Sequence, residues 1–332
     1  MGSPTAVDIH TASPLDNFAI AYQQAQTEFA APRGAPMVQV QHKSDSYYIW
    51  GKALEFQDGL KARAPGSDFA ELSQSLSTGS YACVQYGAER RLADEMTDDE
   101  DPGVKLEQSA VRFLMHQALI RRERMWAEKA LATGWTGQTD QTGVDSDSPS
   151  TAEFSQWQRG GSDPLGVLEQ AIDAVGTSCG RRANTIAFGR RVWRRLKQHA
   201  DVRDIVKHTS PDAASPELLA KYLEVAQVIV SGAVYNSADE GQDASMTRIA
   251  DTAVFVGYID PEVTLESMSA LKTFVWMRKA RAGQYNPVTG MRLRSFYDDD
   301  KEATRVRGDI FQDVKVTCAD AGCYFASAVA SS

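Results

Sequence analysis

The feature that most constrains the fold is an uninterrupted helical pattern from Val104 to Ala132, which contains no glycine or proline. The apolar residues that recur there at multiples of three or four positions are Leu106, Ala110, Leu114, Ala118 and Met125. At ~1.5 Å per residue the predicted helix is about 40 Å long. That length is unusual for a compact enzyme domain, so the sequence indicates an architecture built around one isolated long helix.

The segment before this helix, residues 38–97, predicts a long pair of strands that extends away from the rest of the fold. Its strand-like stretches, "MVQVQHKSDSYYIWG" and "GSYACVQYGAERRLAD", are rich in β-branched and aromatic residues. The polar stretch between them contains the turn signal Pro65-Gly66 and predicts a mobile tip. Residues 1–37 are polar and predict an arm with one short helix, "LDNFAIAYQQAQTEFA".

The second half of the chain alternates helix and strand signals. Residues 133–162 are rich in Gly, Ser, Thr and Asp and indicate a domain boundary. Asp163-Pro164 and Ser215-Pro216 each predict a helix start, with strand candidates "NTIAFG", "AQVIVSGAVY" and "DTAVFVGYID" nearby. Residues 163–262 therefore predict a mixed α/β domain, and residues 263–332 predict strands that pack against the long helix. The fold class is α+β.

One stretch, "RRANTIAFGRRVWRRLKQHADVRDIVKHT", is strongly basic although the chain carries a formal net charge of -9. Its seven Lys or Arg residues between Arg181 and Lys197 raise the question of nucleic-acid binding. The predicted helix, however, has Val192, Trp193 and Leu196 on one side, and acids follow it. The acidic balance of the whole chain also argues against an extended phosphate-binding surface. A structural or subunit-contact role is favoured, and nucleic-acid binding remains the alternative.

Three common catalytic motifs are absent: the sequence lacks GxGxxG, GxxxxGK[ST] and HExxH. The acids of "YDDD" (297–300) are interpreted as a solvated rim rather than a cation site. Cys318 and Cys323 bracket "ADAG", which predicts a hairpin turn, and the four cysteines are interpreted as core or strand residues rather than a disulfide framework. We therefore expect no enzyme activity, no cofactor and no metal.

No apolar run is long enough to cross a membrane, and the N-terminus lacks a secretory signal.

The combined order of elements resembles the major capsid proteins of tailed double-stranded DNA phages, which have the Hong Kong 97 type fold. The resemblance rests on "SYACVQYGAERRLADE", "LIRRERMWAE", "SDPLGVLEQAIDAV", the basic stretch and "VIVSGAVYNSADEG", and it extends from about Val38 to the C-terminus. It implies an N-terminal arm at 1–37 and an extended β-hairpin loop at 38–97 that lies over a neighbour. It also implies a peripheral domain at 98–162 with a spine helix at 104–132, an axial domain at 163–262, and peripheral β-strands at 263–332.

By this resemblance, the chain is expected to be a coat protein that self-assembles as hexamers and pentamers. The product would be the icosahedral or prolate head shell around the phage genome, assembled in the host bacterial cytoplasm and located in the virion. An encapsulin-like nanocompartment of the same fold is the main alternative, followed by a DNA-binding regulator and an unrecognised hydrolase.

The resemblance also implies partners. These are portal, decoration proteins and non-specific contact with the packaged double-stranded DNA. Because the arm is short, we expect a separate scaffolding protein and an uncleaved chain. Lys52, Lys61 and Asn286 are present, but their context does not match that of cross-linked relatives, so no inter-subunit cross-link is expected.

The candidate subunit-contact residues fall into three groups. The segment from Gly59 to Ser77 is expected at the loop tip, in contact with an adjacent subunit. The candidates are Lys61, Arg63, Asp68 and Glu71 in the loop, Arg121, Arg122 and Arg124 on the long helix, and Arg190 and Arg194 in the basic stretch.

Overall fold

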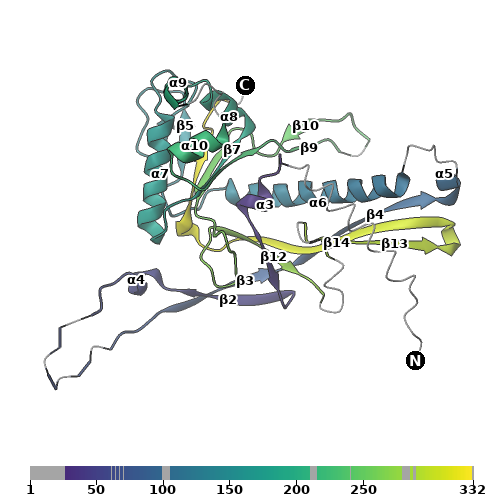
Figure 1. The fold of residues 1–332 in the computed structure, drawn as a ribbon, viewed down its shortest axis with the longest axis horizontal. Coiled ribbons are helices and arrows are strands. Elements are labelled where there is room, and N and C mark those ends of the chain that lie inside the picture. The colour runs from purple at the N-terminus through teal and green to yellow at the C-terminus, as the bar shows by residue number, and fades with distance from the viewer. Residues whose placement is uncertain are drawn as a thin grey trace.

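The computed structural model describes residues 27–60, 62–63, 65–66, 68–69, 71–98, 105–209, 215–239, 241–278, 285–286 and 289–330. One long helix, α6 (Leu106–Ala130), runs beside a twisted sheet, and a second, more helical unit lies at one end of it (Figure 1). The helix predicted at 104–132 is thus observed over slightly tighter bounds. The arm helix predicted for residues 15–30 falls almost wholly outside the described residues.

The first sheet, here called the peripheral sheet, is organised around the long strand β14 (Ala303–Val316). One side of β14 pairs with β4, and the other side pairs first with β13 and then with β12, which carries β1 at its far edge. These four strands are β4 (Val84–Ala93), β13 (Arg292–Asp298), β12 (Leu271–Trp276) and β1 (Met37–Val40).

Helix α6 covers one face of the peripheral sheet because its apolar stripe matches the alternation of the strands. Leu114 and Met115 of the helix pack in one buried cluster with Val306 and Ile310 of β14 and Leu92 of β4. Side chains at alternate positions of a strand point to opposite faces, so Arg305 and Arg307 lie on the face away from the helix. The stripe that predicted the helix therefore also explains its packing.

The second sheet, here called the axial sheet, has six strands in the order β6-β5-β15-β11-β7-β8. The strands are β5 (Gln141–Val144), β6 (Glu153–Ser155), β7 (Thr185–Gly189), β8 (Gln227–Ser231), β11 (Val254–Gly257) and β15 (Gly322–Ala326). The helices of this unit are α7 (Pro164–Cys179), α8 (Arg190–Leu196), α9 (Ala200–Thr209) and α10 (Pro216–Tyr222). All five residues of β7 are buried, as expected for a central strand.

Both predicted helix starts are confirmed. The Asp163 carboxylate accepts a hydrogen bond from Gly166 N at 2.8 Å, and the Ser215 hydroxyl accepts one from Leu218 N at 3.2 Å. Each helix has proline in its first turn, where no backbone donor is needed. Local chemistry was sufficient to locate these two ends.

The remaining elements are short. A two-stranded hairpin, β2 (Ser44–Trp50) with β3 (Leu76–Ala82), projects from the peripheral sheet and leads through α4 (Lys52–Glu55) to its tip (Figure 1). A second small hairpin pairs β9 (Val234–Asn236) with β10 (Met246–Arg248). The others are α3 (Ala31–Gly34), α5 (Asp94–Asp98), η2 (Asp299–Lys301) and η3 (Ala319–Ala321).

The sheet membership of several strands differs from the boundaries predicted from the sequence. Strands β1 and β4 fall at the two ends of the loop predicted at 38–97 but pair within the peripheral sheet, so the projecting hairpin spans only 44–82. Strands β5, β6 and β15 fall in segments predicted as peripheral but belong to the axial sheet. Periodicity identifies a strand but not its distant partner, because pairing depends on contacts between remote parts of the chain.

The hairpin predicted between Cys318 and Cys323 is wrong. Strand β14 ends at Val316 in the peripheral sheet, and β15 begins at Gly322 in the axial sheet, so the "ADAG" turn joins two sheets rather than two paired strands. All four cysteines have free thiols, and three of them are buried. Among the described residues, the helices are too short or too polar to span a bilayer.

Candidate subunit-contact surfaces

The β2–β3 hairpin leaves the peripheral sheet at a tightly packed aromatic base. Tyr81 stacks on Phe274 of β12 with ring centroids 4.6 Å apart, and Tyr47 lies against the same ring at 5.6 Å. Cys83, at the bend between β3 and β4, is buried and donates to the Phe274 carbonyl at 3.5 Å. Burial raises the pKa of this thiol to about 11, so it remains protonated and unreactive at neutral pH. The direction of the hairpin is therefore set by core packing at its base.

A second attachment holds the hairpin to the axial unit of the same chain. Lys52 Nζ lies 2.7 Å from Asp320 Oδ2, and the Thr136 hydroxyl donates to the other oxygen of Asp320 at 2.6 Å. Burial alone would raise the pKa of Asp320, but the hydrogen bonds from Lys52 and Thr136 hold it below its ordinary value. A Cβ atom at Gly180 would lie 2.5 Å from the Phe56 ring, so this ring rests directly on the left-handed end of α7.

Beyond these attachments, the hairpin exposes an unusual amount of apolar surface. Leu60 is 87% exposed and Phe69 is 80% exposed. We call the whole set the loop apolar surface, and its eight members are Tyr48, Ile49, Trp50, Phe56, Leu60, Phe69, Leu72 and Leu76. Large exposed apolar side chains gathered on one projecting element are typical of an interaction site.

The charged loop candidates lie among these apolar side chains. Arg63 is exposed, and its guanidinium lies 4.1 Å from the centroid of the Phe69 ring. Asp68 and Glu71 are also exposed. Lys61 lies outside the described residues. The described candidates are thus accessible to a neighbouring molecule.

The three candidate arginines of α6 divide into two groups. Arg121 and Arg124 are exposed and stack on Tyr86 of β4 and Tyr235 of β9, at 4.5 and 4.8 Å from the ring centroids. Arg122 is only 2% exposed and donates to the Ala35 carbonyl at 2.9 Å, and burial lowers its pKa to about 10. Successive helix residues point about 100° apart, so Arg122 faces the core although its neighbour faces solvent. The expectation of a surface contact at Arg122 is corrected on this ground.

The basic stretch forms β7, α8 and α9, and the apolar side of α8 is buried as predicted. Arg190 pairs with Glu28 at 3.5 Å, and Arg191 pairs with Asp251 at 3.0 Å. Arg194 is exposed on the outer side of the helix. A helix of seven residues, with two arginines engaged by acids of its own chain, favours a structural or contact role over groove binding.

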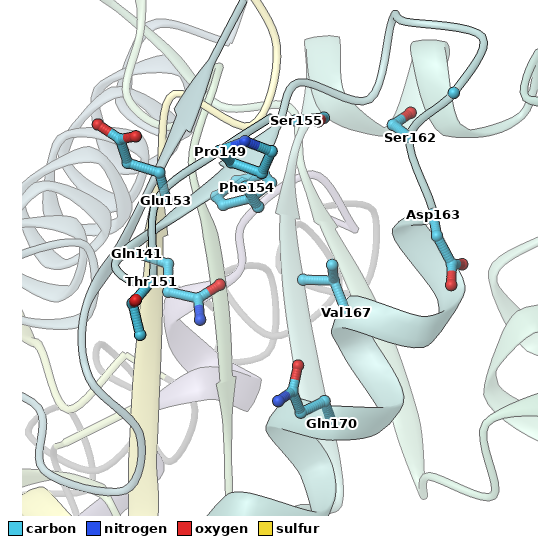
Figure 2. Close-up of a pocket in the computed structure, with 11 residues that line it drawn as sticks. Gln141, Pro149, Thr151, Glu153, Phe154, Ser155, Ser162, Asp163, Val167 and Gln170 are labelled. Atoms are coloured by element: carbon cyan, nitrogen blue, oxygen red, sulfur yellow. The ribbon is translucent and has the colours of Figure 1, made fainter. Parts of the chain in front are cut away.

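One serine, one histidine and one aspartate lie close together, as these residue types do in sites of nucleophilic catalysis. Ser162 Oγ is 3.2 Å from His199 Nε2, and His199 Nδ1 is 3.3 Å from Asp201 Oδ2. Ser162 borders a cavity of about 310 Å³ whose wall also carries the carboxylates of Glu153 and Asp163 (Figure 2).

This arrangement does not support proton transfer. The Ser162 hydroxyl donates to the Arg159 carbonyl at 2.8 Å, and His199 Nδ1 makes no hydrogen bond within the described part of the chain. The two wall carboxylates would also oppose an oxyanion.

The acids of the "YDDD" segment are only partly engaged within the chain, because Asp299 and Asp300 are exposed. The Tyr297 hydroxyl donates to the Asp94 carboxylate, and Arg305 pairs with Asp298. Across the described ranges, no three His, Cys, Asp or Glu side chains form a group that could hold a metal ion. The residues suited to contacts with another subunit are therefore those of the β2–β3 hairpin and of helices α6 and α8.

Comparisons with known proteins agree with this picture. No family model matches the chain. The major capsid protein of Burkholderia phage BcepMu is 26% identical over 225 residues, which cover 67% of this chain and 68% of that protein. A phage-related protein from Bordetella bronchiseptica RB50 has a similar structure, with a TM-score of 0.70, 19% identity, and coverage of 95% of this chain and 97% of the other. The capsid structure of cyanophage P-SCSP1u matches with a TM-score of 0.53 and 14% identity, over 90% of this chain and 88% of the other.

The chain has the Hong Kong 97 type phage capsid fold, with a long helix, a peripheral sheet, an axial unit and a projecting hairpin. The sequence similarity to a curated capsid protein adds to the structural similarity, and together they support a phage major capsid protein. Such a protein has a structural rather than an enzymatic role.

Proposed function

We propose that this chain is the coat protein of a phage head, self-assembling as hexamers and pentamers into an icosahedral or prolate shell around a double-stranded DNA genome. The observation that carries the proposal is the loop apolar surface on a projecting hairpin. Its side chains find few partners within their own subunit, although the base of the hairpin is firmly packed. A second copy of the chain supplies the missing cover.

The energetic reason is the cost of leaving this surface in water. Burying one large apolar side chain stabilises by about 1.5–3 kcal/mol. The gain repeats at every subunit of a closed lattice, so even modest contacts add up over the whole shell. Arg63, Asp68 and Glu71 would favour one geometry of these contacts over others. They would add little free energy, because exposed ion pairs contribute only about 0–1 kcal/mol each.

The domain assignment follows the sheets. The peripheral domain comprises the peripheral sheet and α6, and the axial domain comprises the axial sheet with α7 to α10. The exposed Arg194 and Arg190 then lie where axial units of different subunits approach one another. Arg121 and Arg124 are exposed on the long helix and would belong to contacts of the peripheral domain.

The proposal includes partners other than the chain itself. These are a separate scaffolding protein, a portal, decoration proteins and non-specific contact with packaged DNA, with assembly in the host bacterial cytoplasm. Exposed arginines on two helices fit non-specific contact with phosphates, which depends on charge rather than on sequence reading.

Electron microscopy of the purified protein, alone and with its scaffold, tests this function. Closed shells of many copies are expected, and sedimentation as monomers or dimers under every condition would contradict it. An encapsulin-like nanocompartment would also form shells, so the contents distinguish the two. Nucleic acid inside particles isolated from infected cells supports the phage coat protein, to which the sequence similarity also points.

A further inference from the structure

The segment just before β1 contacts both sheets. We call residues Glu28–Pro36, which include α3, the strap. At one end, Gly232 N, directly after β8, donates to the Glu28 carbonyl at 3.0 Å. At the other end, Thr273 of β12 donates from its hydroxyl to the Ala35 carbonyl at 2.8 Å. The strap therefore spans from the axial sheet to the peripheral sheet, beside α6 (Figure 1).

A buried carboxylate of α6 lies at the centre of the strap. Glu123 is fully buried, with Oε1 3.0 Å from Ala30 N and Oε2 2.7 Å from Ala31 N. The Ser231 hydroxyl, at the end of β8, donates to Oε1 at 2.8 Å. One carboxylate thus binds the first turn of α3 and the end of an axial strand at the same time.

The surroundings of Glu123 leave little room for another arrangement. The charged group next to it is Arg122 of the same helix, which donates to the Ala35 carbonyl further along the strap. A Cβ atom at Gly34 would lie 2.6 Å from Trp126 Nε1, so the strap backbone approaches α6 too closely for a side chain at that position. Burial raises the pKa of Glu123, whereas the hydrogen bonds from Ala31, Ser231 and Ala30 and the charge of Arg122 oppose this rise.

A charged side chain in this position is expensive, since removing a carboxylate from water costs several kcal/mol even after relaxation. An apolar side chain would fill the space without that cost but could not accept hydrogen bonds from two backbone N–H groups and a hydroxyl. The carboxylate therefore selects one position of the strap relative to β8.

We propose that Glu123 is a positioning residue that fixes the strap against α6 and couples the position of the strap to the axial sheet. A partner or neighbour that displaces the strap would then change the end of β8. By linkage, a change at the end of β8 would alter the strap to the same degree in free energy. The coupling is a property of the single subunit, so it can be tested separately from shell formation.

The sharpest test is Glu123→Gln, measured by hydrogen–deuterium exchange on the unassembled subunit. Glutamine has the same size, but its amide nitrogen is a donor and cannot accept from either backbone N–H, so one of Ala30 or Ala31 loses its partner. Exchange in the peptide covering 27–36 is expected to be about tenfold faster, which corresponds to about 1.4 kcal/mol. The peptide covering 227–233 should also exchange faster. Glu128→Gln, on an exposed turn of the same helix, is the matched control and should change neither peptide.

A folded Glu123→Gln subunit with unchanged exchange at 27–36 would overturn the proposal. Faster exchange at 27–36 with no change at 227–233 would overturn the coupling. If Glu123→Gln does not fold, Ser231→Ala decides, because the Ser231 hydroxyl bonds to Glu123 rather than to the strap. Faster exchange at 27–36 in that variant is expected, and its absence would contradict transmission through Glu123.

Discussion

Tyr81 of the projecting hairpin stacks on Phe274 of the peripheral sheet with ring planes only 16° apart. Tyr81 is 6% exposed, whereas Tyr48 on the same hairpin is 70% exposed. The hairpin thus has a base that belongs to the core and an outer part that does not. Stability and assembly should depend on different residues of the same two strands.

Tyr81→Leu should lower the free energy of unfolding. Leucine keeps apolar bulk but loses the stacked ring pair, which contributes about 1 kcal/mol beyond burial. Tyr48→Leu is the matched control, because exposed substitutions usually change stability by no more than about 0.5 kcal/mol. Urea unfolding of both variants measures the difference. Equal losses would show that the base is not part of the core.

Replacing residues 59–72 by a short Gly-Ser turn should leave a folded subunit that no longer forms normal shells. The replacement stops before β3, which begins at Leu76, so the paired part of the hairpin remains. It removes Leu60, Phe69 and Leu72, which are exposed in the subunit and whose burial is proposed to require a neighbour. Circular dichroism reports folding and electron microscopy reports assembly. Normal shells from this variant would contradict the role of the loop apolar surface.

Lys52→Ala should loosen the hairpin without much change in stability. The Lys52 side chain is 48% exposed, and exposed ion pairs contribute about 0–1 kcal/mol. Limited proteolysis within residues 52–60 should become faster, because α4 loses its attachment to Asp320. Lys129→Ala, an exposed lysine of α6, serves as the control. Unchanged cleavage would mean that packing of Phe56 on Gly180 suffices to hold α4.

The contribution of Asp320 to stability should disappear in acid. Its folded-state pKa lies below the unfolded value of about 3.9, so its contribution is present above that pH and is lost as the pH falls through the folded pKa. The difference in unfolding free energy between the wild-type chain and Asp320→Asn should therefore be constant near neutral pH and shrink below about pH 4. Urea titrations at a series of pH values measure it. A difference that persists in strong acid would assign the effect to shape rather than to charge.

Local chemistry in the sequence was enough to predict the long helix, two further helix starts and a buried central strand. The absence of glycine and proline from Val104 to Ala132 predicts α6, and the Asp163 and Ser215 caps locate two further helix starts. The buried strand β7 follows from a short apolar run. The order of these elements was also sufficient for the resemblance to phage capsid proteins. The helix and strand predictions depend on neighbouring residues only, and the resemblance depends on their order along the chain.

The tertiary structure decided which distant segments meet. Strands β5 and β15 are separated by most of the axial unit in sequence, yet they pair in one sheet. Cys318 lies in the connection between the two sheets and Cys323 lies within β15, so the two cysteines do not face each other across a hairpin. Arg122 and Glu123 look like surface charges in the sequence, since charged residues on a long helix are usually solvated. Their burial depends on the strap, more than eighty residues earlier in the chain, and no local pattern contains that contact. Periodicity tells which face of an element is apolar, whereas the partner of each face is decided only when the whole chain packs.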